Sequence, residues 1–305
     1  MLVVCVGECL LELSGRIGHP IRLAFGGDTL NTAVYLARLG LECAYLTALG
    51  DDPYSDELLE CWHAEHVRTD LVARLPGRLP GLYAIRTSEH GERQFFYWRT
   101  ASAARALLAS PASDELLAAA ARADVLYLSG ITLSLYEPPE RLRLVGLAER
   151  VRARGGQVAF DPNFRPACWP SLGEARKAVE QIASCVSFAL PTLQDEIALW
   201  DDGTAETAAA RWLAAGAREV AVKLGAGGVY VASGTAGGHV GAGVADHVID
   251  TTGAGDAFNA GYLAMRLRGA SPMAAARLGN DLAAIVVQHP GAIVPREATA
   301  PLCSA

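Results

Sequence analysis

Short apolar runs alternate with segments of helical periodicity along most of this chain. The runs are Leu2 to Val6, Cys43 to Leu49, Val125 to Ser129, Val158 to Asp161, Ser187 to Leu190 and Val220 to Lys223, and the helical segments are 28–39, 53–65, 138–153, 171–184 and 192–214. Strands that are apolar throughout cannot leave one face in water, so helices must cover both faces of their sheet. The alternation therefore predicts an α/β fold with three layers around a mainly parallel sheet.

Two stretches do not follow this alternation, residues 10–25 and residues 81–100. The second stretch, GLYAIRTSEHGERQFFYWRT, carries β-branched and aromatic residues on both sides of a turn at Ser88 to Gly91, which predicts an antiparallel hairpin. We expect a small β-sheet lid, from about 10–25 and 78–100, inserted in a single domain that spans 1–305. A decorative hairpin at the sheet edge is the alternative.

Composition and charge exclude several classes of protein. With 51% hydrophobic residues among 305, the chain can bury a substantial core. The net charge is −7 and the basic residues are scattered, so we expect no nucleic-acid partner. No run of eighteen apolar residues occurs, and Glu8 and Glu12 interrupt the apolar N-terminus, so neither a membrane span nor a secretory signal is predicted.

Cysteine and lysine usage narrows the chemistry further. The seven cysteines are odd in number and form no CxxC pair, which favours reduced, buried thiols in a cytoplasmic protein. Lys177 and Lys223 are the only lysines, and neither stands in a GxxxxGK[ST] loop. A P-loop nucleotide enzyme is therefore excluded.

The stretch DTTGAGDAFNAGYLA, residues 250–264, places small residues directly before a helical segment that we expect from Ala257 to Leu267. Small residues let the backbone approach a ligand, and the free amides at a helix N-terminus bind anions, so the turn can hold a phosphate. Asp256 would lie beside that anion, where it could accept a proton from an attacking hydroxyl. It could equally be a first-turn acid that complements the helix dipole.

The same stretch resembles the C-terminal signature of the ribokinase-like (PfkB) carbohydrate kinases. In that family the glycine turn forms an anion hole and the last aspartate is the catalytic base. The resemblance implies these roles for Gly253, Ala254, Gly255 and Asp256, and it places Asp250 at the edge of the sugar or metal site.

An N-terminal stretch carries the matching signature. FGGDTLNTAVYLARLG, residues 25–40, resembles the family's sugar-binding turn of two glycines that leads into a helix. The resemblance implies that Gly26, Gly27 and Asn31 meet substrate hydroxyls. Two signatures in the right order, more than two hundred residues apart, are a specific match.

Further stretches resemble the branch of this family that phosphorylates 2-keto-3-deoxygluconate. They are GECLLELSG (7–15), RLPGLYAIRT (78–87), GERQFFYWRTASAAR (91–105), LYLSGI (126–131), FDPNFRPACW (160–169) and VIDTTGAGDAFNAGYLA (248–264). The resemblance implies transfer of a phosphoryl group from ATP, with Mg²⁺, to the 6-hydroxyl of 2-keto-3-deoxy-D-gluconate. It leaves room for a monovalent cation such as K⁺, and we expect a homo-oligomer formed through the lid sheet.

A sugar acid needs a cation at its carboxylate, and a guanidinium offers two donors at a fixed geometry. Arg99 ends the predicted hairpin, and Arg165 follows a strand that ends at Asp161, where α/β folds place ligands. The resemblance implies that both arginines hold the acid end, while Tyr83 and Tyr97 line the lid side of the pocket.

The nucleotide side is implied by VAVKLGAGGVYV, residues 220–231, and by RLGNDLAA, residues 277–284. Here Gly225, Ala226 and Gly228 would lie beside the nucleotide phosphates, and Asn280 would lie near adenine. Lys223 would either contact phosphate or only end a strand.

One motif departs from the family. Many relatives carry Asn-x-x-Glu to organise a magnesium-bound water, whereas this chain has Thr192 to Asp195. Asp195 could still hold a metal-bound water, or the two residues could cap a helix.

Three other functions are weighed against the sugar-acid kinase. A kinase for a neutral ketohexose such as fructose would share the phosphate machinery. A Schiff-base aldolase would need a pocket lysine such as Lys223, but would have no use for the Gly-Ala-Gly-Asp turn. A non-catalytic sugar sensor should have lost Asp256 or the anion hole, and both are intact.

Overall fold

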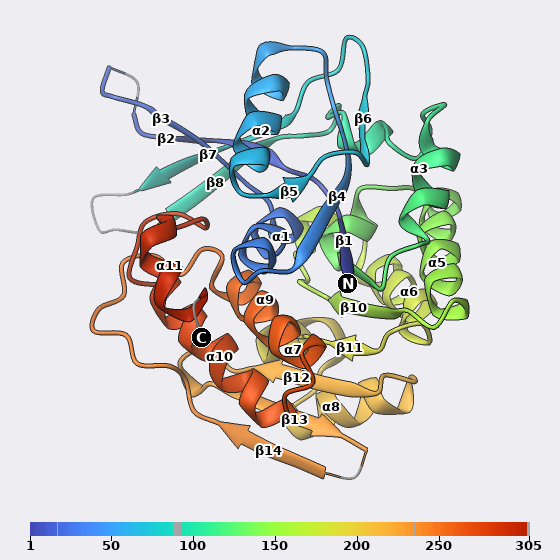
Figure 1. Cartoon of the computed structure of the whole chain (residues 1–305), viewed down its shortest axis with the longest axis vertical. Helices are drawn as coiled ribbons and strands as arrows, with labels where there is room; N and C mark the ends of the chain where they lie inside the picture. The colour runs from blue at the N-terminus through green and yellow to red at the C-terminus, as the bar shows by residue number, and fades with distance from the viewer. Residues whose placement is uncertain (17, 88–92, 235, 304–305) are drawn as a thin grey trace.

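The computed structural model describes the whole chain except residues 17, 88–92, 235 and 304–305 (Figure 1). The hairpin turn expected at Ser88 to Gly91 lies outside the described residues.

A large, mainly parallel sheet forms the centre of the molecule (Figure 1). Within the described residues its order is β14-β13-β12-β11-β10-β9-β1-β4-β5, with β6 also paired to β4. The strands are β1 (Leu2–Val6), β4 (Glu42–Leu49), β5 (Val67–Arg68), β6 (Val72–Arg74), β9 (Val125–Ser129), β10 (Gln157–Asp161), β11 (Phe188–Ala189), β12 (Glu219–Lys223), β13 (Val229–Ser233) and β14 (Ala236–Val240). Among the described strands of this sheet, β13 and β14 at one edge are the ones that pair antiparallel with their neighbours. The predicted parallel sheet is confirmed.

Helices cover both faces of this sheet. One face carries α1 (Asp28–Arg38), α2 (Pro53–Ala64), α9 (Ala254–Leu267), α10 (Pro272–Val286) and α11 (Arg296–Cys303). The other carries α3 (Ser113–Ala120), α4 (Gly130–Ser134), α5 (Pro138–Ala153), α6 (Leu172–Ala183), α7 (Leu193–Trp200) and α8 (Ala205–Ala214). In β1, Val4 and Val6 pack into one core and Val3 and Cys5 into the other, which explains the unbroken apolar run. None of the described helices has the length and apolar character to cross a bilayer.

The single helix predicted over 192–214 is wrong. Helix α7 ends at Trp200 and α8 begins at Ala205. Between them Asp201 adopts a left-handed conformation with φ 64°, and the hydroxyl of Thr204 caps α8 by accepting from the amide of Thr207 at 3.2 Å. The helical period continues across the break, so periodicity alone hid these two caps.

A second, four-stranded sheet lies beside the body and is called the small sheet (Figure 1). Its strands are β3 (Arg22–Gly26), β2 (Leu10–Ser14), β7 (Gly81–Thr87) and β8 (Arg93–Trp98), in that spatial order. Strands β7 and β8 pair antiparallel with Tyr83 opposite Tyr97, as expected for the flanks of a hairpin. Because facing residues share one side of a sheet, Tyr83 and Tyr97 project from the same face.

Candidate active site

A cavity of about 520 Å³ lies between the carboxyl ends of the parallel strands and the small sheet. Glu8 follows β1, Asn163 follows β10, and Lys223 ends β12. The strands of the large sheet that follow β1 in the chain lie on opposite sides of it, β4 on one side and β9 on the other, so the strand order reverses at β1. In α/β sheets, ligands bind in the crevice at such a reversal. The predicted site residues that line the cavity are Gly27, Asn31, Tyr83, Tyr97, Arg99, Arg165, Lys223, Gly253, Gly255 and Asp256.

The glycine turn meets the cavity at the N-terminus of α9. Gly253 has φ 76°, and a Cβ there would lie 2.8 Å from Ala292, so both conformation and space require glycine. Helix α9 begins at Ala254, three residues earlier than expected. The first amides of a helix have no partner within it, so those of Gly255 and Asp256 are available to an anion.

Asp256 stands in the first turn of α9, opposite the turn of two glycines. The amide nitrogen of Asn31 donates to Asp256 Oδ2 at 2.8 Å, while the amide oxygen of Asn31 accepts from the backbone of Gly27 at 3.4 Å. Asn31 therefore links the two signature motifs. Burial, reinforced by the nearby Asp28 carboxylate, raises the pKa of Asp256 from 3.8 to about 7, a value suited to a general base.

Asp28 and Asn163 were not singled out by the sequence, yet both line the cavity. The amide of Asn163 donates to Asp28 Oδ2 at 2.9 Å, and its backbone N–H donates to Asp161 Oδ1 at 3.0 Å. Asn163 adopts a left-handed conformation with φ 34°, two residues after the end of β10. The available signal was position, since Asp28 belongs to the glycine signature and Asn163 follows a strand end.

Lys223 is buried at the floor of the cavity. Its ammonium donates to Asp161 Oδ2 at 2.6 Å and to Asn259 Oδ1 at 3.0 Å, and the Asn259 amide also donates to Asp161, at 2.7 Å. A Cβ on Gly255 would lie 3.6 Å from the ammonium nitrogen. Lys223 thus carries positive charge to the edge of the glycine turn while it is paired with Asp161.

Arg99 is buried and paired with a carboxylate that the sequence did not reveal. Its guanidinium forms an ion pair with Glu8, and their side chains are only 11% and 1% exposed. Glu8 comes from the body and Arg99 from the segment after β8, so the pair ties the small sheet to the body.

Arg165 is also paired, but at the surface. Its Nη1 lies 3.1 and 3.2 Å from the two carboxylate oxygens of Asp195 and 2.8 Å from the carbonyl oxygen of Phe164. Asp195 stands in the first turn of α7, and the next residue, Glu196, is buried and accepts from Trp212 Nε1 at 3.1 Å. Asp195 rather than Glu196 is therefore the acid of this turn that pairs with Arg165.

Aromatic rings form the small-sheet side of the cavity. The ring of Tyr83 lies 6.3 Å from Phe95 and 5.9 Å from Tyr97, between centroids. The Tyr83 hydroxyl donates to the buried Glu12 carboxylate. Burial and this carboxylate raise the pKa of Tyr83, so the phenol stays protonated and keeps its place.

The remaining predicted residues lie outside the cavity lining. Asp250 accepts from Thr252 and from Gly291 N, the latter at 2.6 Å, and so holds the glycine turn. The Asn280 amide donates to the carbonyl oxygen of Gly241 at 2.7 Å. Gly225 and Gly228 have φ 59° and 90°, in the tight turn between β12 and β13. The lining also omits Gly26, Ala254, Ala226 and Asp195.

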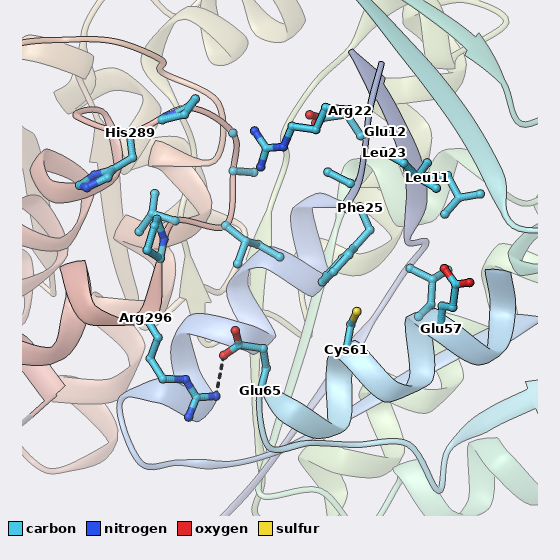
Figure 2. A pocket seen from close by; sticks show the side chains of 18 of the residues that line it. Leu11, Glu12, Arg22, Leu23, Phe25, Glu57, Cys61, Glu65, His289 and Arg296 are labelled. Carbon is cyan, nitrogen blue, oxygen red and sulfur yellow. Dashed lines mark hydrogen bonds and ion pairs between the residues drawn. The ribbon is translucent and has the colours of Figure 1, made fainter. Parts of the chain in front are cut away.

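A second cavity, of about 720 Å³, lies on the other side of the segment 289–296, between α2 and strands β2 and β3. Figure 2 shows Phe25 directed from β3 toward α2, which carries Cys61, and the ion pair of Glu65 with Arg296 at 2.9 Å. Cys61 is exposed, so the expected burial of every cysteine is wrong there. Ala292 lines both cavities, so this segment separates the second cavity from the glycine turn.

Comparison with known proteins identifies the family. A model of the pfkB family carbohydrate kinases matches residues 1–299. The chain belongs to this family. The resemblance inferred from the two signatures is thereby confirmed.

Individual relatives extend this match. The 2-dehydro-3-deoxygluconokinase of Escherichia coli (strain K12) is 44% identical over 309 residues, which cover 97% of this chain and 98% of that protein. The crystal structure of the PfkB protein from Polaromonas sp. JS666 superposes with a TM-score of 0.84 at 27% identity, covering 98% of this chain and 99% of that one. The crystal structure of a protein from E. coli in complex with ATP and Mg²⁺ shares the fold with a TM-score of 0.83 at 23% identity, covering 95% of this chain and 94% of that one.

Proposed function

We propose that this protein transfers the γ-phosphoryl group of ATP to the 6-hydroxyl of 2-keto-3-deoxy-D-gluconate, also called 2-dehydro-3-deoxygluconate. The observation that carries the proposal is one cavity in which Asp256, at a helix N-terminus, faces the same space as Arg99 and Arg165. A phosphoryl-transfer end and a carboxylate-binding end are what a sugar-acid kinase requires. Relatives named 2-dehydro-3-deoxygluconokinase, 37–44% identical over nearly the full chain, support this substrate. Because the reaction consumes ATP, we expect it in the cytoplasm.

Asp256 is the proposed base. Its pKa of about 7 lets the carboxylate take the proton of the 6-hydroxyl near neutral pH, as the hydroxyl oxygen attacks phosphorus. Asn31 orients the carboxylate. The turn from Gly253 to Asp256 is proposed to stabilise charge on the phosphoryl oxygens through the free amides of Gly255 and Asp256, and Lys223 adds positive charge beside Gly255.

The residues present fit Mg²⁺ bound with the nucleotide. Within the described part of the chain, no three His, Cys, Asp or Glu side chains cluster to hold a metal by themselves. Mg²⁺ suits such a site, because it binds through one or two carboxylates together with substrate phosphates and keeps several waters. Asp195 is the proposed carboxylate, and Mg²⁺ would neutralise charge on the transferring group. Gly225, Ala226, Gly228 and Asn280 are proposed for the nucleotide side.

The acid end is proposed to bind Arg99 and Arg165, between Tyr83 and Tyr97. Gly26, Gly27 and Asp250 are proposed to shape the sugar side of the site. Holding the carboxylate by charge places the 6-hydroxyl at the other end, near Asp256, which is a proximity effect. The small sheet is proposed to act as a lid that excludes water from the phosphoryl group.

We also propose that two copies associate through the outer face of this lid. Leu23 lies opposite Leu13 and Phe96 opposite Ala84, so these residues form an apolar row on the face away from Tyr83. Leu23 and Phe96 are each 45% exposed and Trp98 is 63% exposed. An open apolar sheet face favours a second copy of the same face. Light scattering should report a dimer that the Trp98→Asp variant weakens.

A kinase for a neutral ketohexose such as fructose is the second candidate. The observation that favours it is that Arg99 and Arg165 are both already paired with carboxylates. A neutral sugar needs no further cation. If this candidate holds, substitution of the exposed Arg165 should leave turnover unchanged.

A coupled assay of ADP release decides between the two. Purified protein with Mg·ATP is given 2-keto-3-deoxygluconate, fructose, ribose or gluconate in turn, with and without K⁺. Preference for the keto acid supports the proposal. Preference for fructose or ribose keeps the kinase chemistry and rejects the acid pocket.

A further inference from the structure

The ion pair of Arg165 with Asp195 joins two residues assigned above to different ligands. Arg165 is proposed for the sugar acid and Asp195 for the magnesium nucleotide, yet in the structure they bind each other. We propose that Asp195 sets substrate specificity by occupying Arg165 until the magnesium nucleotide draws Asp195 away, which frees Arg165 for the sugar acid. This inference rests on the proposed function.

The geometry of the pair is poor for an arginine and a carboxylate. Both oxygens of Asp195 contact the single nitrogen Nη1, at 3.1 and 3.2 Å, and the same nitrogen also contacts the carbonyl oxygen of Phe164. A stronger arrangement uses two guanidinium nitrogens side by side against two oxygens. A substrate carboxylate that reached Nη2 as well would therefore bind Arg165 better than Asp195 does.

The two arginines of the cavity differ in freedom to change partner. Arg99 is 11% exposed and its partner Glu8 1%, so breaking that pair would leave a buried charge. Arg165 is 52% exposed and can rotate in water while Asp195 stays on its helix. Arg165 is thus the cation that can be exchanged, and Arg99 is fixed.

Asp195 lies where it can serve either partner. It stands in the first turn of α7, three residues after Thr192, which lines the cavity and bridges to Lys223 through the backbone. Lys223 is already held by Asp161 at 2.6 Å, so it does not compete for Asp195. Carboxylate oxygen is a preferred ligand of Mg²⁺, directly or through a bound water.

The exchange predicts coupling between the two ligands. The sugar acid and the magnesium nucleotide each bind better when the other is present. The first ligand to bind separates Asp195 from Arg165, and the second then binds without that cost. The coupling applies to acids, since a neutral sugar gains nothing from a freed guanidinium. It disfavours binding of the sugar acid without nucleotide and therefore selects the productive complex.

Titration calorimetry with Mg·ADP tests this without turnover. The Kd of 2-keto-3-deoxygluconate is measured with and without Mg·ADP, and that of fructose likewise. For the wild-type protein we expect the keto acid to bind about tenfold more tightly with Mg·ADP. In Asp195→Asn the keto acid should bind more tightly than in wild type when Mg·ADP is absent, and the coupling should fall to about onefold.

Asp202→Asn is the matched control. Asp202 also pairs with an arginine, Arg211, at 2.9 Å, and its side chain is 13% exposed against 15% for Asp195. The coupling should persist in this variant. Coupling that survives in Asp195→Asn, or that is equal for fructose, overturns the inference. A keto acid that binds under no condition instead rejects the proposed function, which separates the two failures.

Discussion

Replacing Asp28 by asparagine tests how the cavity tunes its base. Asp256 has a pKa of about 7, against an ordinary 3.8, and Asp28 is the charged neighbour that raises it most after burial. Removing that charge should lower the pKa of Asp256 by on the order of one unit, or ~1.4 kcal/mol. The asparagine keeps an oxygen that accepts from Thr29 N. Its amide nitrogen replaces the oxygen that accepted from Asn163, and the Asn163 amide can rotate so that its own oxygen accepts from that nitrogen.

The assay is kcat/KM for the keto acid between pH 5 and 9, which reports ionisations of the free enzyme. At pH 6 a base with a pKa of 7 is about one-tenth ionised, and one with a pKa of 6 is about half ionised. The ratio of kcat/KM at pH 6 to kcat/KM at pH 8 should therefore be about fivefold higher in the variant than in wild type. Dividing by the wild-type profile cancels ionisation of the substrates. The exposed Asp246→Asn is the control. An acid limb at the same pH in wild type and Asp28→Asn would refute the reasoning.

Three further predictions follow from the same geometry. Asp256→Asn should lose roughly 10²–10⁴ in turnover. Because burial raises the pKa of Asp256 in the folded protein, ionisation of this carboxyl destabilises the wild type, and the variant should melt at a higher temperature. The difference in Tm between variant and wild type should open between about pH 4 and 7 and then stay constant. A difference in Tm between variant and wild type that is the same at pH 4 and pH 8 would contradict this. Gly253→Ala should cost about 1–3 kcal/mol in denaturant unfolding, since φ is 76° and Ala292 leaves no room for a Cβ, and turnover should fall with it; wild-type stability would rule out the strain. Arg165→Ala should raise KM for the keto acid several-fold and leave kcat nearly unchanged, as for uniform binding, and an unchanged KM removes Arg165 from the acid site.

Much of the body was predictable because its signals are local. The runs from Leu2 to Val6 and from Val125 to Ser129 are the observed strands β1 and β9, since continuous apolar residues bury on both faces of a covered sheet. The helix over 192–214 failed because Asp201 and Thr204 cap two helices within one unbroken period. The family could be inferred because the glycine turn and its aspartate are adjacent in sequence.

The pairings within the site could not be read from the sequence. Glu8 and Arg99 are ninety-one residues apart, and Arg165 and Asp195 thirty apart, so only the closed fold brings each pair together. Charge was visible in the motifs, but not which charges neutralise one another. The raised pKa of Asp256 is likewise a property of burial and of Asp28.

The sequence by itself determined the α/β body, the family and the glycine turn with the aspartate proposed as base, because the signal for each lies in residues that are close together in the sequence. Only the tertiary structure decided that Arg99 is committed to Glu8 while Arg165 is held loosely by Asp195. It decided this because the exposure of an ion pair and its geometry depend on which elements pack around it. Those two properties are the basis for the proposal that Arg165, rather than Arg99, can exchange its partner for a sugar acid.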